Sequence, residues 1–341
     1  MQKVRMAVVG VGHLGRHHAR ILAATPDVEL VGVSDNDAAR CAEVAAQCGV
    51  PAYEDYRALI PQVDAASIVV PTSFHYDVAA AFLNAGKSLL VEKPLAADVA
   101  EANGLVELAR RRGGVLQVGH IERFNPVLSA LPQSAPRPRH IEARRVGPYS
   151  FRSTDIGVVF DLMIHDLDIV LALTDELPRQ VTASGWSAFG GLEDVVAARL
   201  EFAGGTTAHL TASRADVQPS REMTIRWTHG VARLDFAAQR TVVSLPTPAY
   251  FAAAPQLARP HPKLIPSLKE KMNGTFFTVT ERDWSGGREL LAVELEHFVT
   301  CVRTHTRPLV SGESARDSVV VAAAIERSIR TGAESGLAQA A

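Results

Sequence analysis

The chain has 341 residues, which is enough for about two domains at roughly 100–200 residues each. Its 35 Lys and Arg residues against 37 Asp and Glu leave a formal net charge of −2, and 47% of the residues are hydrophobic. This balance excludes a disordered chain and argues against a nucleic-acid binder, which would carry a basic stripe. Cys41, Cys48 and Cys301 form no C-x-x-C pair, so we expect no disulfide framework, no metal site of the zinc type and a reducing, cytoplasmic setting.

The first 120 residues alternate between short apolar runs and helix-period stretches. We predict strands at residues 4–9, 28–34, 67–70, 89–92 and 115–118, and helices at 14–24, 38–47, 75–85 and 98–112. Strands separated by such helices indicate βαβ units and a parallel sheet that is buried on both faces. The apolar run at 4–9 is far shorter than the ~20 residues that cross a bilayer, so we expect a buried strand and no membrane association.

The rest of the chain, residues 121–341, predicts an α+β domain with an open, largely antiparallel sheet. Hairpin patterns at 197–213 and 222–236 turn at Gly204-Gly205 and His229-Gly230, where glycine tolerates a positive φ. Helices are expected at 161–173, 288–304 and 315–330. Six prolines between residues 246 and 266 predict a long loop that is functional or mobile. The predicted fold class is therefore α/β, with a parallel doubly wound domain over 1–120 and this second domain over 121–341.

Residues 10–15 read Gly-Val-Gly-His-Leu-Gly, a G-x-G-x-x-G motif that follows a strand and opens a helix. In this setting Gly10 permits the tight turn, Gly12 lets the backbone approach a pyrophosphate, and Gly15 lets the helix pack closely on the strand. The helix N-terminus also offers unpaired N–H groups to the anion. The motif predicts an N-terminal Rossmann domain whose cofactor-binding residues include Gly10, Gly12, His13, Leu14 and Gly15.

Asp35 ends the second predicted strand, 20 residues after Gly15. A carboxylate at this place can accept hydrogen bonds from the ribose hydroxyls of an adenosine. The stretch Asp35-Asn36-Asp37 is acidic and contains no arginine, so it would repel a 2′-phosphate. The sequence therefore predicts that the cofactor is NAD rather than NADP.

Two further stretches carry candidate catalytic groups. Lys93 of Glu92-Lys93-Pro94 follows the carboxyl end of a strand, where its ammonium can donate a hydrogen bond to a substrate hydroxyl. Asp161 and His165 are four residues apart and share a face of the predicted helix, so the carboxylate can make His165 a general base near neutral pH. A solvated Lys93, a surface His165, and a metal site that adds Asp168 to the Asp161 and His165 face remain alternatives.

The motifs occur in an order that resembles the Gfo/Idh/MocA oxidoreductases over essentially the whole chain. The matching stretches are the glycine motif, Pro71-Thr72-x-x-His75, Glu92-Lys93-Pro94 and Asp161-x-x-x-His165. The resemblance implies a Rossmann domain followed by an open sheet that forms the substrate site and the interface of a homodimer or homotetramer. It implies that Lys93 and His165 are the catalytic pair with Asp161 beside His165, and that Pro71, Thr72, His75, Glu92 and Lys93 lie along the dinucleotide.

A narrower resemblance concerns the substrate. Residues 119–126 and 161–166 are similar to those of family members that act on nucleotide sugars, such as UDP-N-acetylglucosamine 3-dehydrogenases. This implies oxidation of the C3 hydroxyl, with an aminotransferase acting next, while an inositol or free-sugar dehydrogenase and a non-catalytic NAD-bound sensor remain alternatives. Arginines in this region suit bidentate phosphate contacts. The predicted substrate-binding residues are His120, Arg123, Asn125, Arg145, Arg152, Asp161 and His165.

Overall fold

The computed structural model describes residues 2–132, 135–151, 156–272, 274–333 and 335–336. The chain forms two compact units, each assembled from several stretches. Unit 1 contains Met1–Phe124, Leu167–Leu171 and Arg288–Glu326, and unit 2 contains Asn125–Asp166, Ala172–Gly287 and Arg327–Ala341. This division differs from the predicted one, because Arg288–Glu326 joins the N-terminal stretch. That the two parts serve cofactor and substrate respectively stays a prediction.

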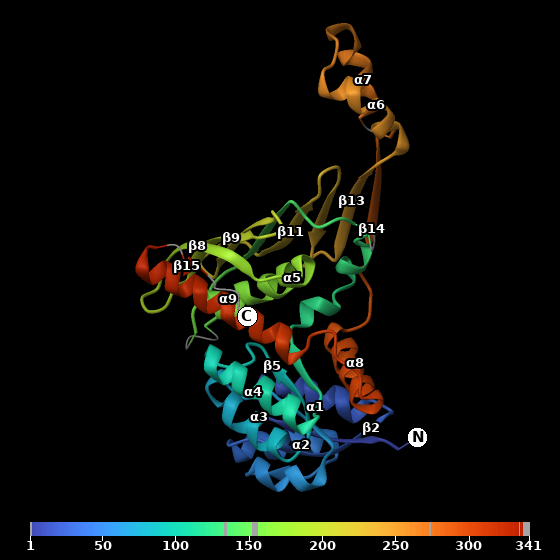
Figure 1. Ribbon diagram of the computed structural model, residues 1–341. Coiled ribbons are helices and arrows are strands. Elements are labelled where there is room, and N and C mark those ends of the chain that lie inside the picture. Colours follow the sequence, from blue (N-terminus) through green and yellow to red (C-terminus); the bar gives the residue numbers. More distant parts are fainter. Residues whose placement is uncertain (1, 133–134, 152–155, 273, 334, 337–341) are drawn as a thin grey trace. The chain divides into compact units, whose positions relative to one another are not determined.

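Unit 1 is built on a six-stranded parallel sheet (Figure 1). Its strands are β1 (Val4–Val9), β2 (Val28–Ser34), β3 (Ala52–Tyr53), β4 (Ala65–Ile68), β5 (Ser88–Glu92) and β6 (Leu116–Gly119). They lie in the order β3-β2-β1-β4-β5-β6, the doubly wound order of dinucleotide-binding domains. The predicted α/β fold class is confirmed, and only the two-residue β3 has too short a pattern to be found from the sequence.

Four helices connect these strands, namely α1 (Gly15–Ala24), α2 (Ala38–Cys48), α3 (His75–Asn84) and α4 (Val99–Arg112). Local chemistry fixes their ends. The side chain of Asp37 accepts a hydrogen bond from the N–H of Arg40 and so caps α2, and Asp98 caps α4 through the N–H of Glu101. Gly49 ends α2 at a φ of 67°, a left-handed conformation that glycine adopts without a steric penalty.

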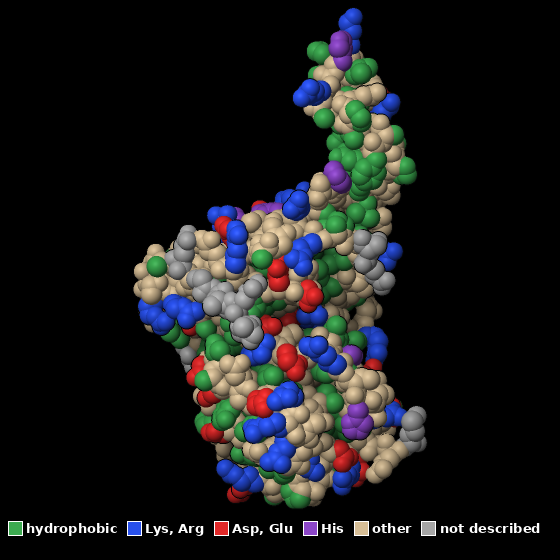
Figure 2. All heavy atoms as spheres, viewed as in Figure 1, with side chains coloured by type: hydrophobic (Ala, Val, Ile, Leu, Met, Phe, Trp, Pro, Cys, Tyr) green, Lys and Arg blue, Asp and Glu red, His purple; other side chains and the backbone are tan. Residues whose placement is uncertain are grey.

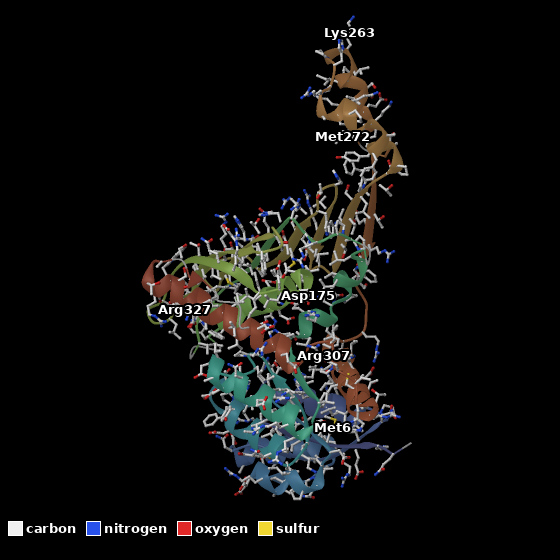
Figure 3. The ribbon with its side chains drawn as sticks, viewed as in Figure 1. Met6, Asp175, Lys263, Met272, Arg307 and Arg327 are labelled. Carbon is white, nitrogen blue, oxygen red and sulfur yellow. The ribbon has the colours of Figure 1, made fainter. Side chains whose placement is uncertain are left out.

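A helix distant in sequence completes the core of unit 1. In α8 (Leu290–Thr304), the side chains of Leu295, Phe298 and Val299 are buried in one cluster with Met6 of β1 and Leu22 of α1. Figure 3 labels Met6 within the sheet. Burial of a large apolar side chain stabilises by ~1.5–3 kcal/mol, so this contact accounts for the place of α8 in unit 1.

Unit 2 is built on a nine-stranded sheet. Its strands are β7 (His140–Val146), β8 (Pro178–Trp186), β9 (Val195–Phe202), β10 (Thr207–Ser213), β11 (Ser220–Arg226), β12 (Val231–Asp235), β13 (Arg240–Pro246), β14 (Phe277–Asp283) and β15 (Ser335–Gly336). They lie in the order β14-β13-β12-β11-β7-β10-β9-β8-β15. Among these described strands only the β7–β10 pair is parallel, so the predicted open, largely antiparallel sheet is confirmed.

Two further helices are α5 (Ile164–Thr174) and α9 (Gly312–Thr331). A π-helical turn, Val159–Met163, leads directly into α5. The helix predicted at 161–173 therefore exists, but its first residues have wider turns than an α-helix. Within the described residues, no helix is both long enough and apolar enough to cross a membrane.

The proline-rich segment forms helices, so the prediction of a long loop is wrong. α6 (Pro248–Ala258) and α7 (Ile265–Lys271) lie between β13 and β14 and project beyond the ends of these strands (Figure 1). Pro248, Pro262 and Pro266 stand in the first two positions of helical segments, where a missing N–H is tolerated. Figure 2 shows hydrophobic side chains over this arm, and Figure 3 places Lys263 at its outer end.

Candidate active site

The glycine motif forms a tight turn between β1 and α1 whose three glycines have different surroundings. A Cβ on Gly10, which has a φ of 85°, would lie 2.6 Å from the carbonyl oxygen of Val69, and a Cβ on Gly15 would lie 1.8 Å from the carbonyl oxygen of Gly10. A Cβ on Gly12 would meet no atom within 4 Å. Gly10 and Gly15 are thus required by the protein's own packing, whereas Gly12 faces open space that a pyrophosphate can fill.

The surroundings of this turn also suit a dinucleotide. His13 and Leu14 of the motif are exposed beside the N-terminus of α1, which presents unpaired N–H groups. Pro71 and Thr72 follow β4, the neighbour of β1, and are exposed and partly buried respectively. These residues stand at the carboxyl ends of adjacent strands, where the strand order reverses and where open α/β sheets bind their ligands.

Asp35 lies directly after β2 with only 8% of its surface exposed. Its Oδ2 accepts a hydrogen bond of 2.8 Å from the N–H of Val11, and its Oδ1 accepts one of 2.9 Å from the N–H of Asp37. The guanidinium of Arg40 contacts both oxygens, at 2.7 Å and 3.3 Å. Burial alone would raise the pKa of Asp35, but Arg40 and the two N–H groups hold it below its usual value. The carboxylate is therefore charged and fixed in orientation at neutral pH.

His75 occupies a different place from the one its motif suggests. Its ring is 1% exposed, with Nδ1 at 2.8 Å from the carbonyl oxygen of Pro94 and Nε2 at 2.9 Å from that of Val70. Burial lowers the pKa of His75. Both nitrogens face carbonyls of the protein, and the neutral ring can donate to one of these carbonyls at a time. The ring thus lies between the segments that follow β4 and β5, and both of its nitrogens face the protein itself. We therefore assign His75 a positioning role.

Lys93 follows β5 and is backed by a buried polar chain. The backbone N–H of Lys93 donates to Oε2 of Glu92 at 3.2 Å. Oε1 of Glu92 lies 3.2 Å from Nε2 of His18. Nδ1 of His18 in turn lies 2.8 Å from the hydroxyl of Ser67 in β4. Burial would raise the pKa of Glu92, but His18 and Lys93 hold it below its usual value. Glu92 is thereby kept as a charged carboxylate against the backbone of Lys93.

A second glycine supports this arrangement. Gly119 ends β6, next to β5, and a Cβ on it would lie 2.8 Å from Oε1 of Glu92. The carboxylate thus lies directly against the backbone of β6. His120 follows and is completely buried, and burial lowers its pKa. Asn125 is also buried and caps the turn that follows by accepting from the N–H of Val127.

The predicted phosphate-binding arginines have carboxylate partners. Arg145 forms two hydrogen bonds with Asp166, at 2.8 Å and 3.1 Å, and both side chains are only 4% exposed. Arg123 lies 3.4 Å from Asp168 and is 15% exposed at its side chain. The guanidinium of Arg145 is buried and bound to Asp166, so Arg145 cannot contact a phosphate in this conformation. Arg123 stays a candidate phosphate ligand. Arg152 lies outside the described residues.

Asp161 and His165 belong to unit 2, and the structure places them on different helical elements. Asp161 lies in the π-helical turn and His165 in the first turn of α5, and both are partly buried. Their four-residue spacing therefore does not run through a regular α-helix. Among the described residues, no group of three or more His, Cys, Asp or Glu side chains is placed to hold a metal ion.

Sequence reasoning missed three polar residues of unit 1. His18 stands on the face of α1 that also buries Leu22, and a buried histidine one turn after a glycine motif was a usable signal. Arg40 lies in the first turn of α2, three residues after the acidic stretch Asp35-Asn36-Asp37. Glu294 of α8 is completely buried, and neither of its carboxyl oxygens has a hydrogen-bond partner among the described residues. Nothing in its local sequence distinguishes it from a solvated glutamate.

Comparison with known families identifies both parts of the chain. Residues 4–120 match the family described as "Oxidoreductase family, NAD-binding Rossmann fold", and residues 134–233 match the "GFO/IDH/MocA C-terminal domain". The first match covers the glycine turn, Asp35 and Lys93. The second covers β7 to β11 and the first residues of β12, but not the arm formed by α6 and α7.

Curated relatives and solved structures agree with these matches. The chain is 38% identical to UDP-N-acetylglucosamine 3-dehydrogenase of Acidithiobacillus ferrooxidans over 96% of each chain, and 27% identical to scyllo-inositol 2-dehydrogenase (NAD(+)) of Bacillus subtilis over 97% of this chain and 95% of that one. The solved structure of the Acidithiobacillus ferrooxidans enzyme has a TM-score of 0.85 at 36% identity, covering 97% of this chain and 99% of that one. Levoglucosan dehydrogenase, solved in complex with NADH, shares the fold with a TM-score of 0.84 at 17% identity over 99% of this chain and 100% of that one. The chain therefore belongs to the Gfo/Idh/MocA oxidoreductases and is an NAD-dependent oxidoreductase of sugar hydroxyls.

Proposed function

We propose that this enzyme oxidises the C3 hydroxyl of UDP-N-acetylglucosamine to the 3-keto sugar. The observation that carries the proposal is the 38% identity to a UDP-N-acetylglucosamine 3-dehydrogenase over 96% of both chains, against 27% to a scyllo-inositol 2-dehydrogenase over a similar length. The inositol dehydrogenase is thus the weaker candidate.

The proposed reaction divides between three side chains and the cofactor. Bound NAD supplies the acceptor for the hydride that leaves the substrate carbon. Lys93 donates a hydrogen bond to the hydroxyl oxygen and stabilises the negative charge that develops there. His165 accepts the hydroxyl proton as general base, and Asp161 orients the imidazole. The carbon–hydrogen bond and the oxygen–hydrogen bond both break, a carbon–oxygen double bond forms, and one proton remains on His165.

The surroundings of Lys93 support its role. Its neighbour Glu92 is held as a carboxylate by His18, and the positive charge of Lys93 also lowers the pKa of Glu92, so the two charges interact favourably. His75 fixes the backbone on the other side of Lys93 by its contact with Pro94. These contacts fix the backbone at Lys93, and a fixed backbone limits the positions from which the ammonium can reach the substrate hydroxyl, as a transition-state contact requires.

The proposed binding groups for the nucleotide sugar are His120, Arg123, Asn125, Arg152, Asp161 and His165. Among the arginines, Arg123 retains part of its surface, and Asp168 contacts one end of its guanidinium. A guanidinium has five donors, so one carboxylate contact leaves donors for a phosphate.

The test is a panel of UDP-sugars, free sugars and inositols at equal concentration with NAD, followed by NADH absorbance. UDP-N-acetylglucosamine should be oxidised far more efficiently than N-acetylglucosamine, because charge-assisted hydrogen bonds to the diphosphate contribute ~1.5–3 kcal/mol each. Faster turnover of myo-inositol or a free hexose than of every UDP-sugar would overturn the substrate assignment. If no compound in the panel leads to NADH, the result would favour a non-catalytic NAD-bound sensor.

The proposal extends to the enzyme's surroundings. We place the reaction in the cytoplasm, where Cys41, Cys48 and Cys301 stay reduced thiols. The product ketone suits an aminotransferase, and adding one should accelerate NADH formation by removing the ketone. A homodimer or homotetramer formed through the sheet of unit 2 would show as twice or four times the 36.6 kDa chain mass in light scattering.

A further inference from the structure

In the structure, every acceptor position of the Asp35 carboxylate faces a donor of the protein. Two hydrogen-bond donors contact each carboxylate oxygen, one from the backbone and one from Arg40. A carboxylate offers about four lone-pair positions, two on each oxygen. The N–H groups of Val11 and Asp37 belong to the backbone and stay in place. A ribose hydroxyl can therefore bind Asp35 only where Arg40 now does.

The guanidinium of Arg40 is free to make room. Its side chain is 35% exposed, while that of Asp35 is 5% exposed. It also has a second anchor, because its Nη1 lies 3.2 Å from Oδ2 of the more exposed Asp37. When it leaves Asp35, the positive charge can remain beside the position that the ribose 2′-oxygen takes.

We propose that Arg40 is a cofactor-selectivity residue, which occupies the ribose-binding positions of Asp35 in the free enzyme and stays near the ribose 2′-position after a dinucleotide displaces it. Two opposite effects follow for the two cofactors. With NAD, displacement of Arg40 subtracts from the affinity, since an ion pair must open. With NADP, the same guanidinium offsets the repulsion between Asp35 and the 2′-phosphate. Asp35 sets the preference for NAD, and Arg40 limits its size.

The proposal is tested by the dissociation constants of NAD and NADP on the full-length protein without sugar, measured by calorimetry. Arg40→Ala should bind NAD as well as the wild type or up to about fivefold tighter, and NADP at least tenfold more weakly. Arg40→Lys, which keeps the charge but loses the fork, should keep NADP binding within about threefold. The Kd ratio of NADP to NAD should therefore rise at least tenfold in the alanine variant only.

A matched control separates this effect from overall charge. Arg110→Ala removes one positive charge from the same unit, where Arg110 pairs with Glu107 on the surface of α4, and should leave the ratio unchanged. Raising the salt concentration should weaken NADP binding to the wild type more steeply than to Arg40→Ala, because exposed charges are screened.

Three outcomes would overturn the proposal. One is a ratio for Arg40→Ala within twofold of the wild type. Another is equal weakening of NAD and NADP, which would mean that Arg40 only holds Asp35 in place. The third is an equal rise of the ratio in Arg110→Ala, which would indicate a general charge effect. If thermal denaturation shows that the alanine variant is unfolded, the Kd ratio of NADP to NAD is compared for Arg40→Gln instead. Because no sugar is present, the result is independent of the proposed substrate.

Discussion

Nε2 of His18 lies 3.2 Å from Oε1 of Glu92, so a histidine of the first helix contacts the residue that precedes the proposed catalytic lysine. The contact lowers the pKa of a carboxyl group that burial alone would raise. A group with a lowered pKa stabilises the fold above its unfolded pKa and loses this contribution as the pH falls through its folded pKa. Glu92 thus links the acid stability of unit 1 to the charge beside Lys93.

His18→Leu should reduce turnover and the stability of unit 1 at neutral pH together. Without His18, burial dominates and the pKa of Glu92 rises, so the carboxylate beside Lys93 is lost at higher pH. We expect the acid limb of the pH–rate profile to move up. The melting temperature should fall more at pH 8 than at pH 5 relative to the wild type, because a buried carboxyl group with a raised pKa loses stability as the pH rises. The control is His17→Leu, since His17 contacts His13 and not Glu92. Parallel pH profiles for the two variants would contradict the role of His18.

Replacing the two proposed catalytic groups should affect turnover and leave cofactor binding intact. Lys93→Met and His165→Asn should each lower kcat by about 10²–10⁴, the usual contribution of a positioned proton-transfer group. The NAD dissociation constant should stay within a few-fold, because the groups proposed to hold the adenosine and pyrophosphate are Asp35 and the glycine turn. His165→Asn should also remove the limb of the pH profile near neutrality. Turnover within a few-fold of the wild type in both variants would refute the assignment.

Much of unit 1 could be predicted because its signals are local. A glycine turn, an acidic residue after the next strand and strands of continuous apolar character each specify their own surroundings, and the observed strands match them closely. Gly12 and Asp35 lie where the motif predicts. The helices of the arm could not be predicted from its six prolines, because a high proline content favours a loop, although proline is well tolerated in the first turn of a helix.

The polar partners of the site could not be predicted, because they come from distant parts of the chain. The distance in sequence is 74 residues between His18 and Glu92 (92 − 18) and 21 residues between Arg145 and Asp166. No local pattern of charge or spacing specifies such pairs. The sequence therefore predicts that Arg145 is a phosphate ligand, whereas the structure buries its guanidinium against the carboxylate of Asp166.

Arg145→Ala should reduce stability rather than substrate affinity. It leaves Asp166 buried without its bidentate partner, and breaking such a pair costs about 3–5 kcal/mol. We expect a clear fall in melting temperature, with the KM for the nucleotide sugar unchanged in the folded fraction. Arg144→Ala is the neighbouring control, because the pair of Arg144 with Asp216 is half exposed and its loss has little effect. A large rise in KM at unchanged melting temperature would restore Arg145 as a substrate ligand.

Glu294→Gln should stabilise the protein at alkaline pH. Burial raises the pKa of Glu294 well above its usual value, and the charges of Glu92 and Asp168 raise it further. A carboxyl group with a raised pKa contributes stability below its unfolded pKa of about 4.3 and loses that contribution as the pH rises through its folded pKa. Glutamine has nearly the same shape and no charge at any pH, so it removes this loss.

The measurement is the melting temperature of Glu294→Gln relative to the wild type between pH 5 and pH 8.5. The variant should gain stability steadily as the pH rises and show little or no gain at the acid end. Glu296→Gln on the same helix is the control, because its side chain is 42% exposed and pairs with Arg288 at the surface, so its difference from the wild type should stay small and nearly constant. A difference for Glu294→Gln that does not change with pH would mean that the carboxyl group is already ionised in the folded protein. Water or a neighbouring group would then have to satisfy the two oxygens that have no hydrogen-bond partner among the described residues.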